Sequence, residues 1–311
     1  MGSDSGQGYE HSALCHSSDR ELLASALPFL NGGVDAGDMV VVALSRARID
    51  LVLAELDRPD AVTVMSIESH YSRPASAIKS YRDLFAASLD GAGSVRVLGE
   101  LPIAAMAEEW DAWARYEAAV NRAFAEFPVR TMCTYDTRVL SRADVDDVLS
   151  THPLIASPTG AHPRNPGYVD PSSFLARPQR AEPDPLQHTP PAVELTNPSP
   201  SVARRAVAAV STLAPGELED LVVSVSEVVT NAHAHGIAPV EVRVWAQPGH
   251  TVVTVRDSGP GPTNPFAGLI PEPGDYGGGY GLWIAHQVCT SVLHTRDATG
   301  FTIRLTMGTP V

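Results

Sequence analysis

The sequence predicts an α/β protein of two domains. The N-terminal domain is a three-layer fold around a parallel sheet, and the C-terminal domain is an α/β sandwich. Apolar runs that suit buried strands alternate with helix-like stretches over residues 11–154, as in a parallel sheet covered on both faces. Residues 193–311 combine amphipathic helical stretches with alternating strands. Between them, prolines interrupt residues 155–192. We therefore expect two folded domains joined by an extended linker, with residues 1–10, rich in Gly and Ser, as a disordered tail.

The N-terminal elements follow one another closely. We expect helices at 21–30, 49–56, 77–89 and 106–127, and strands at 39–44, 62–67, 95–98 and 129–133. The glycine-rich segment 31–38, followed by a strand, a short loop and a helix, has the layout of a RecA-type nucleotide domain. The loop after that strand reads Ser45-Arg-Ala-Arg48 and lacks the Gly-Lys-Ser/Thr of a P-loop. We expect a RecA-like sheet that binds no ATP there.

Residues spread over this domain carry a family resemblance. They are His11-Ser-Ala-Leu14, Phe29-Leu-x-x-Gly33, Gly37-Asp38, Tyr71, Tyr81-Arg82-x-Leu-Phe85, Val97-Leu-Gly-Glu100, Trp113-x-Arg-Tyr-Glu117, Asn121 and Cys133-x-Tyr135-Asp136. The domain resembles the MEDS (DcmR-like) sensory domain, named for methanogen and methylotroph regulators. The resemblance implies an input domain for an unknown sensory ligand. We expect a ligand or partner surface at the C-terminal ends of the strands, the usual crevice in open α/β sheets.

Polar groups in the C-terminal domain suit an ATP pocket. Glu227 and Asn231 lie four residues apart, on one face of a helix. They offer a carboxylate that can act as a general base and an amide oxygen suited to Mg²⁺. Asp257 ends the alternating run 252–256, where its carboxylate can accept a hydrogen bond from a ligand amine.

Glycines follow at two places. Gly259 and Gly261 let the backbone turn tightly beside a flat ring. A second group leads into an apolar helix and presents backbone N–H groups and the positive end of the helix dipole to phosphates. It comprises Gly277, Gly279 and Gly281, followed by Leu282.

These segments resemble the GHKL superfamily of ATPases and kinases, with 227–231 as N box, 257–261 as G1 box and 277–282 as G2 box. The resemblance implies the Bergerat sandwich, with helices on one face of a mixed sheet, and ATP and Mg²⁺ as cofactors. We expect strands at 239–246, 251–256 and 301–307. The loop 262–276 lies where the family keeps its mobile ATP lid, and residues 262–279 contain no Arg or Lys.

Within the superfamily, two strings look like the anti-sigma-factor serine/threonine kinases. They are Val202-Ala-Arg-Arg-Ala206 and Ser226-Glu-Val-Val-Thr-Asn-Ala-x-x-His235-Gly236. The proline-broken stretch before Val193 cannot form the phospho-accepting helical hairpin of histidine kinases.

This resemblance implies a role for each residue. Glu227 would be the general base for a protein serine or threonine, Asn231 the Mg²⁺ ligand and Asp257 the adenine anchor. Phosphate contacts would come from Gly279 and Gly281, and a further adenine contact from Thr302.

Together the resemblances imply a cytoplasmic bacterial regulator in which the MEDS-like domain controls an anti-sigma factor. The kinase would phosphorylate an anti-anti-sigma antagonist of the STAS type, and homologous modules commonly form homodimers. The alternative is a non-catalytic switch that binds ATP, or has lost it, and sequesters a sigma factor or another regulator. The lid without Arg or Lys favours the alternative, whereas the intact Glu227 favours the kinase.

Charge and hydropathy exclude other classes. A net charge of −14, from 22 basic and 36 acidic residues, disfavours direct nucleic-acid binding and suits a partner with basic patches. No apolar run approaches about 18 residues and no signal peptide is present, so we expect no membrane span or export.

Three cysteines are too few for a disulfide framework. Cys15 and His16, with Cys133 and His11, could form a metal or redox site if the fold joins them. Without paired Cys-x-x-Cys spacing, buried thiols and a surface histidine are the commoner outcome.

Overall fold

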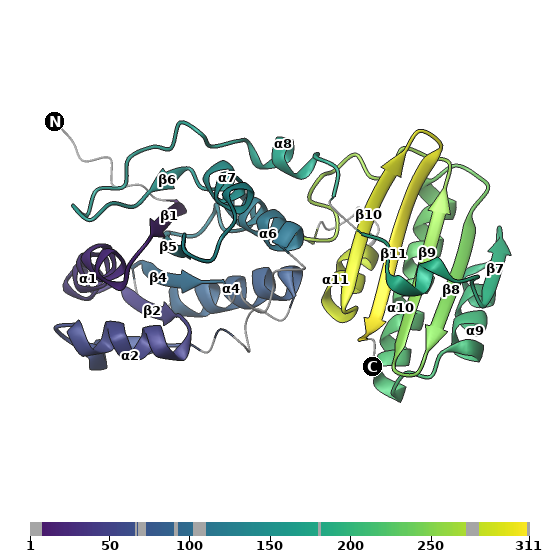
Figure 1. Cartoon of the computed structure of the whole chain (residues 1–311), viewed down its shortest axis with the longest axis horizontal. Coiled ribbons are helices and arrows are strands. Elements are labelled where there is room, and N and C mark those ends of the chain that lie inside the picture. The colour runs from purple at the N-terminus through teal and green to yellow at the C-terminus, as the bar shows by residue number, and fades with distance from the viewer. Residues whose placement is uncertain are drawn as a thin grey trace. The chain divides into compact units, whose positions relative to one another are not determined.

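The computed structural model describes residues 8–65, 67, 73–89, 93–101, 110–179, 182–271 and 280–309. The chain forms two compact units, Met1–Leu175 and Ala176–Val311 (Figure 1). Within the described ranges, no helix combines the length and apolar character that crossing a bilayer requires.

The N-terminal unit alternates strands with helices. Its strands are β1 (Glu10–His16), β2 (Met39–Ala43), β3 (Val62–Val64), β4 (Val95–Glu100), β5 (Val129–Asp136) and β6 (Leu154–Ile155). Its helices are α1 (Asp19–Ala36), α2 (Arg46–Glu55), the short η1 (Pro59–Ala61), α4 (Pro74–Leu89), α6 (Trp110–Ala123), α7 (Arg142–Thr151) and α8 (Pro171–Leu175). The strands form one sheet in the order β3-β2-β4-β5-β1-β6, with parallel pairs throughout.

Helices cover both faces of this sheet (Figure 1). Leu14, Val42 and Met132 lie on one face and share a core with residues of α1 and α2. Because side chains alternate along a strand, His11 lies on the other face, where Nδ1 is 3.1 Å from Oδ1 of Asn121 on α6. The predicted three-layer fold is therefore confirmed.

The helix predicted at 21–30 is longer than expected. Helix α1 continues through the glycine-rich segment to Ala36 and is capped by Gly37, whose φ is 76°. A Cβ atom on Gly33 would lie 2.7 Å from Cδ of Arg96. Arg96 crosses the helix there and donates to Asp38 at 2.6 Å and to the carbonyl of Phe29 at 3.0 Å. Close packing on an arginine, rather than a nucleotide loop, explains this glycine.

Part of the proline-rich segment packs on the N-terminal unit. Phe174 and Leu175 are each 5 % exposed, and Nη1 of Arg115 donates to the carbonyl of Leu175 at 2.8 Å. The amide of Asn165 donates to the carbonyl of His152 at 2.8 Å. Residues 163–175 thus contribute to this unit, as the aromatic Phe174 suggests.

The C-terminal unit places its longer helices on one face of an antiparallel sheet. Its helices are η3 (Pro185–His188), α9 (Pro200–Val210), α10 (Pro215–His235) and α11 (Gly281–Val288). Its strands are β7 (Val193–Thr196), β8 (Glu241–Gln247), β9 (His250–Asp257), β10 (Ser291–Asp297) and β11 (Gly300–Gly308), in the order β10-β11-β9-β8-β7. Every pair is antiparallel. The sequence predicts a mixed sheet, and this expectation was wrong.

The core of this unit joins α9, α10 and α11 to the sheet. It includes Val207, Val225, Val255, Ala285 and Leu305, and the predicted α/β sandwich is confirmed. The segment before β7 packs on the strands: Nε1 of Trp245 donates to the carbonyl of Thr189 at 2.8 Å, and Nε2 of His250 lies 3.0 Å from Asp184. These contacts extend the unit upstream of Val193.

Candidate functional site

Glu227 and Asn231 lie on one face of α10, at the edge of the core. Leu221, Val225 and Val228 form the buried side of the helix, whereas Glu227 and Asn231 are half-buried. In the described part of the chain, neither of these two side chains has a hydrogen-bond or ion-pair partner. Within the described ranges, both predicted groups are thus left unpaired.

Helix α11 begins against Glu227. A Cβ atom on Gly281 would lie 2.4 Å from Oε2 of Glu227, closer than real contacts allow. No side chain caps α11, and the amide of Ile284 is bonded to the carbonyl of Tyr280 at 2.7 Å. The preceding amides, Leu282 among them, make no hydrogen bond to a described residue, and they form the positive end of the helix dipole. The Leu282 side chain itself belongs to the core.

Asp257 is 6 % exposed at the end of β9. Its Oδ1 accepts from the backbone N–H of Gly259 at 2.6 Å and of Ile237 at 3.1 Å. Its Oδ2 makes no hydrogen bond to a described residue. One oxygen thus holds the carboxylate in place, and the other is left to accept from a ligand amine.

Glycines surround this carboxylate. A Cβ atom on Gly259 would lie 2.6 Å from Oδ1 of Asp257, and one on Gly236 would lie 2.5 Å from its Cγ. At Gly300, where φ is +156°, a Cβ atom would lie 2.1 Å from the carbonyl oxygen of Asp257. The motif pointed to Gly259, but sequence reasoning assigned no role to Gly236 or Gly300. Gly236 directly follows α10 and Gly300 lies in the β10–β11 turn, and these positions could have suggested a role for them.

Gly261 turns beside a flat ring that belongs to the protein itself. Its φ is +72°, which favours glycine, and a Cβ atom there would lie 2.5 Å from the ring of Phe301. Phe301 is 7 % exposed. The structure thus gives Gly261 a packing role.

Thr302 does not join the other predicted residues. It lies opposite Arg256 in the β9–β11 register, while Asp257 lies opposite Phe301. Neighbouring residues of a strand point to opposite faces, and Thr302 Oγ1 accepts from Nη1 of Arg256 at 2.9 Å. Thr302 therefore lies on the face of the sheet away from Asp257.

Gly277 and Gly279 lie outside the described residues, as does Tyr71. The described beginning of the predicted lid packs on α11, with Phe266 2 % exposed. A Cβ atom on Gly268, whose φ is +85°, would lie 2.4 Å from His286. Burial, and then the neighbouring imidazole of His294, lower the pKa of His286 to about 3.

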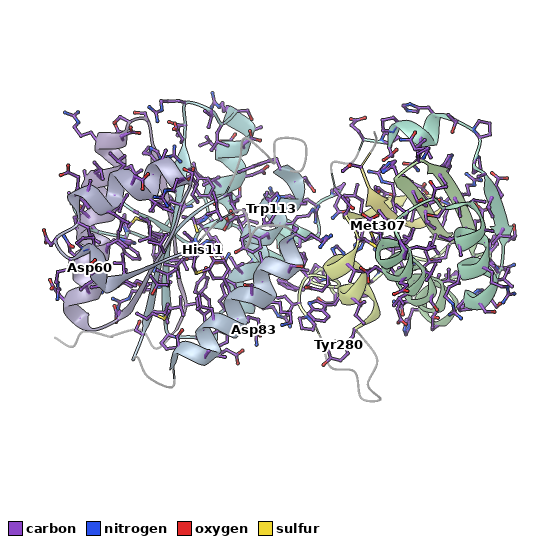
Figure 2. All side chains as sticks on the ribbon, turned by 90° about the horizontal axis from the view of Figure 1, so that it is seen from below. His11, Asp60, Asp83, Trp113, Tyr280 and Met307 are labelled. Atoms are coloured by element: carbon purple, nitrogen blue, oxygen red, sulfur yellow. The ribbon has the colours of Figure 1, made fainter. Side chains whose placement is uncertain are left out.

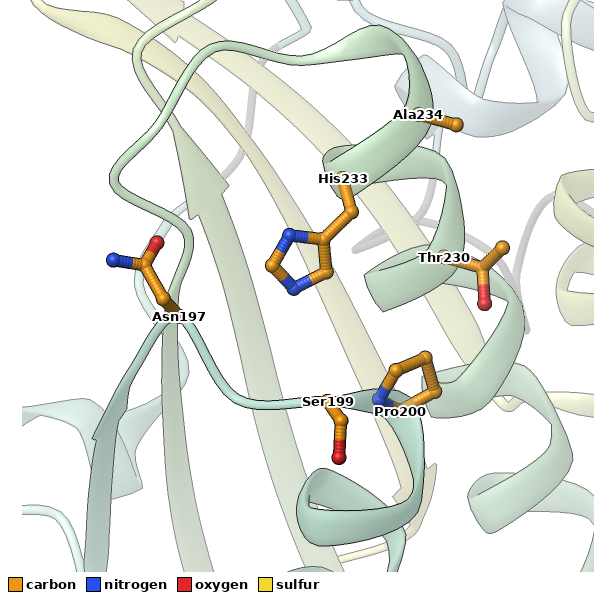
Figure 3. A pocket seen from close by; sticks show the side chains of 6 residues that line it. All are labelled: Asn197, Ser199, Pro200, Thr230, His233 and Ala234. Carbon is orange, nitrogen blue, oxygen red and sulfur yellow. The ribbon is translucent and has the colours of Figure 1, made fainter.

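A separate cavity of about 540 Å³ lies beside the C-terminal part of α10 (Figure 3). It is lined by Asn197, Ser199, Pro200, Thr230, His233 and Ala234. Nε2 of His233 is 2.8 Å from the carbonyl oxygen of Pro198, to which it donates. None of Glu227, Asn231 and Asp257 lines this cavity, so it is distinct from the predicted ATP residues.

At the C-terminal ends of the N-terminal strands, charged side chains bind one another. Arg48 pairs with Glu100 and, at 2.7 Å, with Asp136. Nη2 of Arg138 donates to Asp136 at 2.6 Å. Hydrogen bonds from Arg138 hold the pKa of Asp136 well below its usual range. Arg48, which the sequence analysis placed in the loop after the strand, lies in the first turn of α2 and binds carboxylates of its own domain.

The described residues of the C-terminal unit fit ATP and Mg²⁺. Asp257 offers an acceptor for the amine of a purine, Asn231 an amide oxygen of the kind Mg²⁺ takes, and α11 its first amides for phosphates. Gly236, Gly259 and Gly281 leave room where a Cβ atom would collide.

Comparisons with known proteins agree with both resemblances. Residues 10–153 match the family model of the MEDS domain, described as the methanogen/methylotroph, DcmR sensory domain. Residues 193–307 match the model of the histidine kinase-like ATPase domain. The chain therefore combines a MEDS domain with a histidine kinase-like ATPase domain.

No curated protein matches the chain. Among solved structures, the NMR structure of the histidine kinase domain of the E. coli osmosensor EnvZ is similar, with 19% sequence identity. The match covers 40% of this chain and 92% of that one, with a TM-score of 0.24.

Proposed function

We propose that this protein is a bacterial anti-sigma factor with ATP-dependent serine/threonine kinase activity towards a STAS-type anti-anti-sigma antagonist, acting in the cytoplasm. One observation carries the proposal. The half-buried Glu227 carboxylate, with no partner among the described residues, lies beside the uncapped start of α11. A module that only bound nucleotide would have no chemical need for a base at this position.

Each residue then has a task. Oδ2 of Asp257 accepts from the adenine amine, and the first amides of α11 bind phosphate oxygens. Asn231 would hold Mg²⁺, which supplies charge neutralisation on the phosphates. Glu227 takes the proton of the serine or threonine hydroxyl as that oxygen attacks phosphorus.

The MEDS domain would control this activity in response to its ligand. Phosphorylation of the antagonist would decide whether the kinase unit holds the antagonist or the sigma factor. The net charge of −14 suits a partner with basic patches. A homodimer of the kinase unit is part of the proposal.

The test uses the full chain, because the contacts of Asp184 and Thr189 extend the C-terminal unit upstream of Val193. ATP affinity is measured by calorimetry with and without Mg²⁺, and phosphoryl transfer is measured against the STAS proteins of the same genome. We expect Asn231→Ala to abolish Mg²⁺-dependent binding and Glu227→Gln to keep binding but lose transfer. Unchanged ATP affinity in the Asn231 variant would show that the ATP site is wrongly assigned.

A second function is favoured by the lid, where residues 262–279 contain no Arg or Lys. Protein kinases stabilise the transferring phosphoryl group with positive charge, and a chain without it can act by sequestration alone. Wild-type protein that binds ATP and a sigma factor but transfers no phosphate to any STAS protein would identify this non-catalytic switch.

A further inference from the structure

Four side chains capable of binding a metal lie together inside the N-terminal unit. They are His11, Glu117, Cys133 and His152, and one ligand atom of each lies within 4.8 Å of all the others. The residues come from β1, α6, β5 and the C-terminal end of α7, so the fold gathers them from four elements. His11 and His152 are 0 % exposed and Glu117 is 2 % exposed. Figure 2 labels His11 in the interior of this unit.

Neighbouring groups orient both imidazoles towards the cluster. Nδ1 of His11 lies 3.1 Å from Oδ1 of Asn121, whose amide nitrogen donates to the carbonyl of Thr151 at 2.8 Å. The Asn121 oxygen is therefore the acceptor, and Nδ1 of His11 carries the proton. Nδ1 of His152 likewise donates to the carbonyl of Val148 at 2.8 Å. Both Nε2 lone pairs are left for the cluster, as in metal sites whose histidines donate their other N–H to a second shell.

Three of the distances between ligand atoms are close to those of a tetrahedral site. Nε2 of His11 lies 3.1 Å from Oε2 of Glu117 and 3.5 Å from Sγ of Cys133. Nε2 of His152 lies 3.6 Å from the same carboxylate oxygen. Metal–ligand distances of about 2.0–2.3 Å in tetrahedral zinc sites imply ligand–ligand separations of roughly 3.3–3.8 Å. Small side-chain movements would complete the geometry.

Among the described residues, the cluster holds more hydrogen-bond acceptors than donors. Oε2 of Glu117 is buried and no hydrogen-bond donor of the described chain reaches it. Both imidazoles donate from Nδ1, to Asn121 and to the carbonyl of Val148, so Nε2 of each neutral ring carries a lone pair and cannot donate. The hydroxyl of Tyr135 lies 3.4 Å from Nε2 of His152 and is also hydrogen-bonded to the Glu117 carboxyl, and its single proton can satisfy one of these acceptors. Buried polar atoms are rarely left unpaired, and a cation would satisfy these together.

We propose that the N-terminal unit binds one divalent transition-metal ion through His11, Glu117, Cys133 and His152. Two imidazoles, a thiolate and a carboxylate form a donor set suited to Zn²⁺. On binding, the metal–sulfur bond forms as the thiol proton of Cys133 leaves to solvent, and no redox step is required. The proposal is independent of the proposed kinase function, because it involves only the N-terminal unit.

A small cavity of about 20 Å³ borders the cluster. His11, Glu117 and Cys133 line it together with aromatic side chains that include Tyr9, Tyr81 and Phe124. A volume of this size holds about one water molecule. The bound ion can therefore take one further water-sized ligand, which would link the metal to the sensory role of a MEDS domain.

The test titrates Co²⁺, a spectroscopic stand-in for Zn²⁺, into full-length protein stripped with a chelator. We expect one equivalent to bind, with a sulfur-to-cobalt charge-transfer band and the visible bands of a four-coordinate ion, and Zn²⁺ to displace it. Cys133→Ser should abolish the charge-transfer band and weaken binding at least about tenfold. Cys15→Ser is the matched control, because this half-buried thiol on β1 lies outside the cluster.

Two outcomes would overturn the proposal. One is folded wild-type protein that binds no Co²⁺ or Zn²⁺, in which case a protonated Glu117 carboxyl, visible by infrared spectroscopy, supplies the missing donor. The other is a charge-transfer band that survives in Cys133→Ser. If Cys133→Ser unfolds, His152→Gln serves as a second variant, with its folding checked by circular dichroism. If His152→Gln binds Co²⁺ as tightly as the wild type does, the proposed site is also wrong.

Discussion

Glu227 and Gly281 are in such close contact that a Cβ atom on the glycine would lie 2.4 Å from the carboxylate oxygen Oε2 and 2.9 Å from Cβ of Glu227. The side chain proposed as general base and the first residue of the helix proposed to bind phosphate therefore occupy adjoining space. The lack of space for a side chain explains why position 281 is glycine, independently of any role of its backbone N–H in binding phosphate.

A methyl group at this contact should disturb both functions. We expect Gly281→Ala to displace Glu227 or the start of α11, at a cost of about 1–3 kcal/mol, and to weaken ATP binding by roughly tenfold or more. Calorimetry of the full chain measures this. Gly216→Ala is the control, because nothing lies within 4 Å of a Cβ atom at that helical position; an equal loss in both variants would contradict the steric explanation.

The two oxygens of Asp257 should be separable. In Asp257→Asn, the amide oxygen can still accept from Gly259 and Ile237, but the amide nitrogen replaces the acceptor Oδ2. We expect near wild-type thermal stability with a marked loss of ATP affinity. Asp257→Ala should also destabilise the fold by about 1–3 kcal/mol, because two backbone donors lose their partner. If Asp257→Asn binds ATP normally, Oδ2 does not contact adenine.

Thr302 should be dispensable for nucleotide binding. Its hydroxyl accepts from Arg256 on the face away from Asp257, so Thr302→Val should leave ATP affinity unchanged. Stability should fall by about 0.5–1.5 kcal/mol for the lost hydrogen bond. The same calorimetric titration measures the ATP affinity of Thr302→Val. A large loss of affinity would show that Thr302 does contribute to the ATP site.

The N-terminal unit should lose stability in acid through Asp136. Its pKa is depressed in the folded state, chiefly by hydrogen bonds from Arg138. The stabilisation is therefore present above the ordinary carboxyl pKa of about 3.9 and is lost as pH falls through the lower folded value.

Urea unfolding at a series of pH values measures this dependence. Asp136→Asn should be less stable than wild type at neutral pH by about 1–3 kcal/mol, and the difference should shrink in acid. Asp50→Asn, which removes an exposed pair with Arg46, should change little. A constant difference across the pH series would show that ionisation of Asp136 is not the cause.

The boundary of the N-terminal unit can be tested by truncation. A fragment that ends at Leu154 lacks Phe174 and Leu175, which are buried in the full chain. We expect it to unfold more easily than one that ends at Gln179, by about 1.5–3 kcal/mol for each lost side chain. Equal urea midpoints would place the unit's end at Leu154.

Sequence patterns predicted the elements of both units where apolar periodicity was strong. The helix carrying Glu227 and Asn231 and the strand ending at Asp257 lie where expected, because each combines a clear period with a chemical motif. The strands β7 and β10 were missed. β7 has only four residues, Val193–Thr196, too few for their alternation to stand out from the flanking loops. Helix α1 extends beyond its predicted end because Gly33 packs on Arg96, a residue that is distant from it in the sequence.

The parts of the sites that depend on register or tertiary contact were beyond sequence reasoning. The side of the sheet to which Thr302 points follows from its pairing with Arg256. Sequence reasoning grouped His11 and Cys133 with Cys15 and His16. The fold brings only the first two together and adds Glu117 and His152, which come from separate helical elements.

The crowding around Asp257 has a consequence for reading related sequences. A side chain at position 236 would strike the carboxylate, and one at position 300 would strike the backbone carbonyl of the same residue. A chain with all three boxes intact but a larger residue at either position could not hold its aspartate in this pose. We therefore expect glycine at 236 and 300 in relatives that keep the proposed purine acceptor, and larger residues only in those that have kept the fold alone.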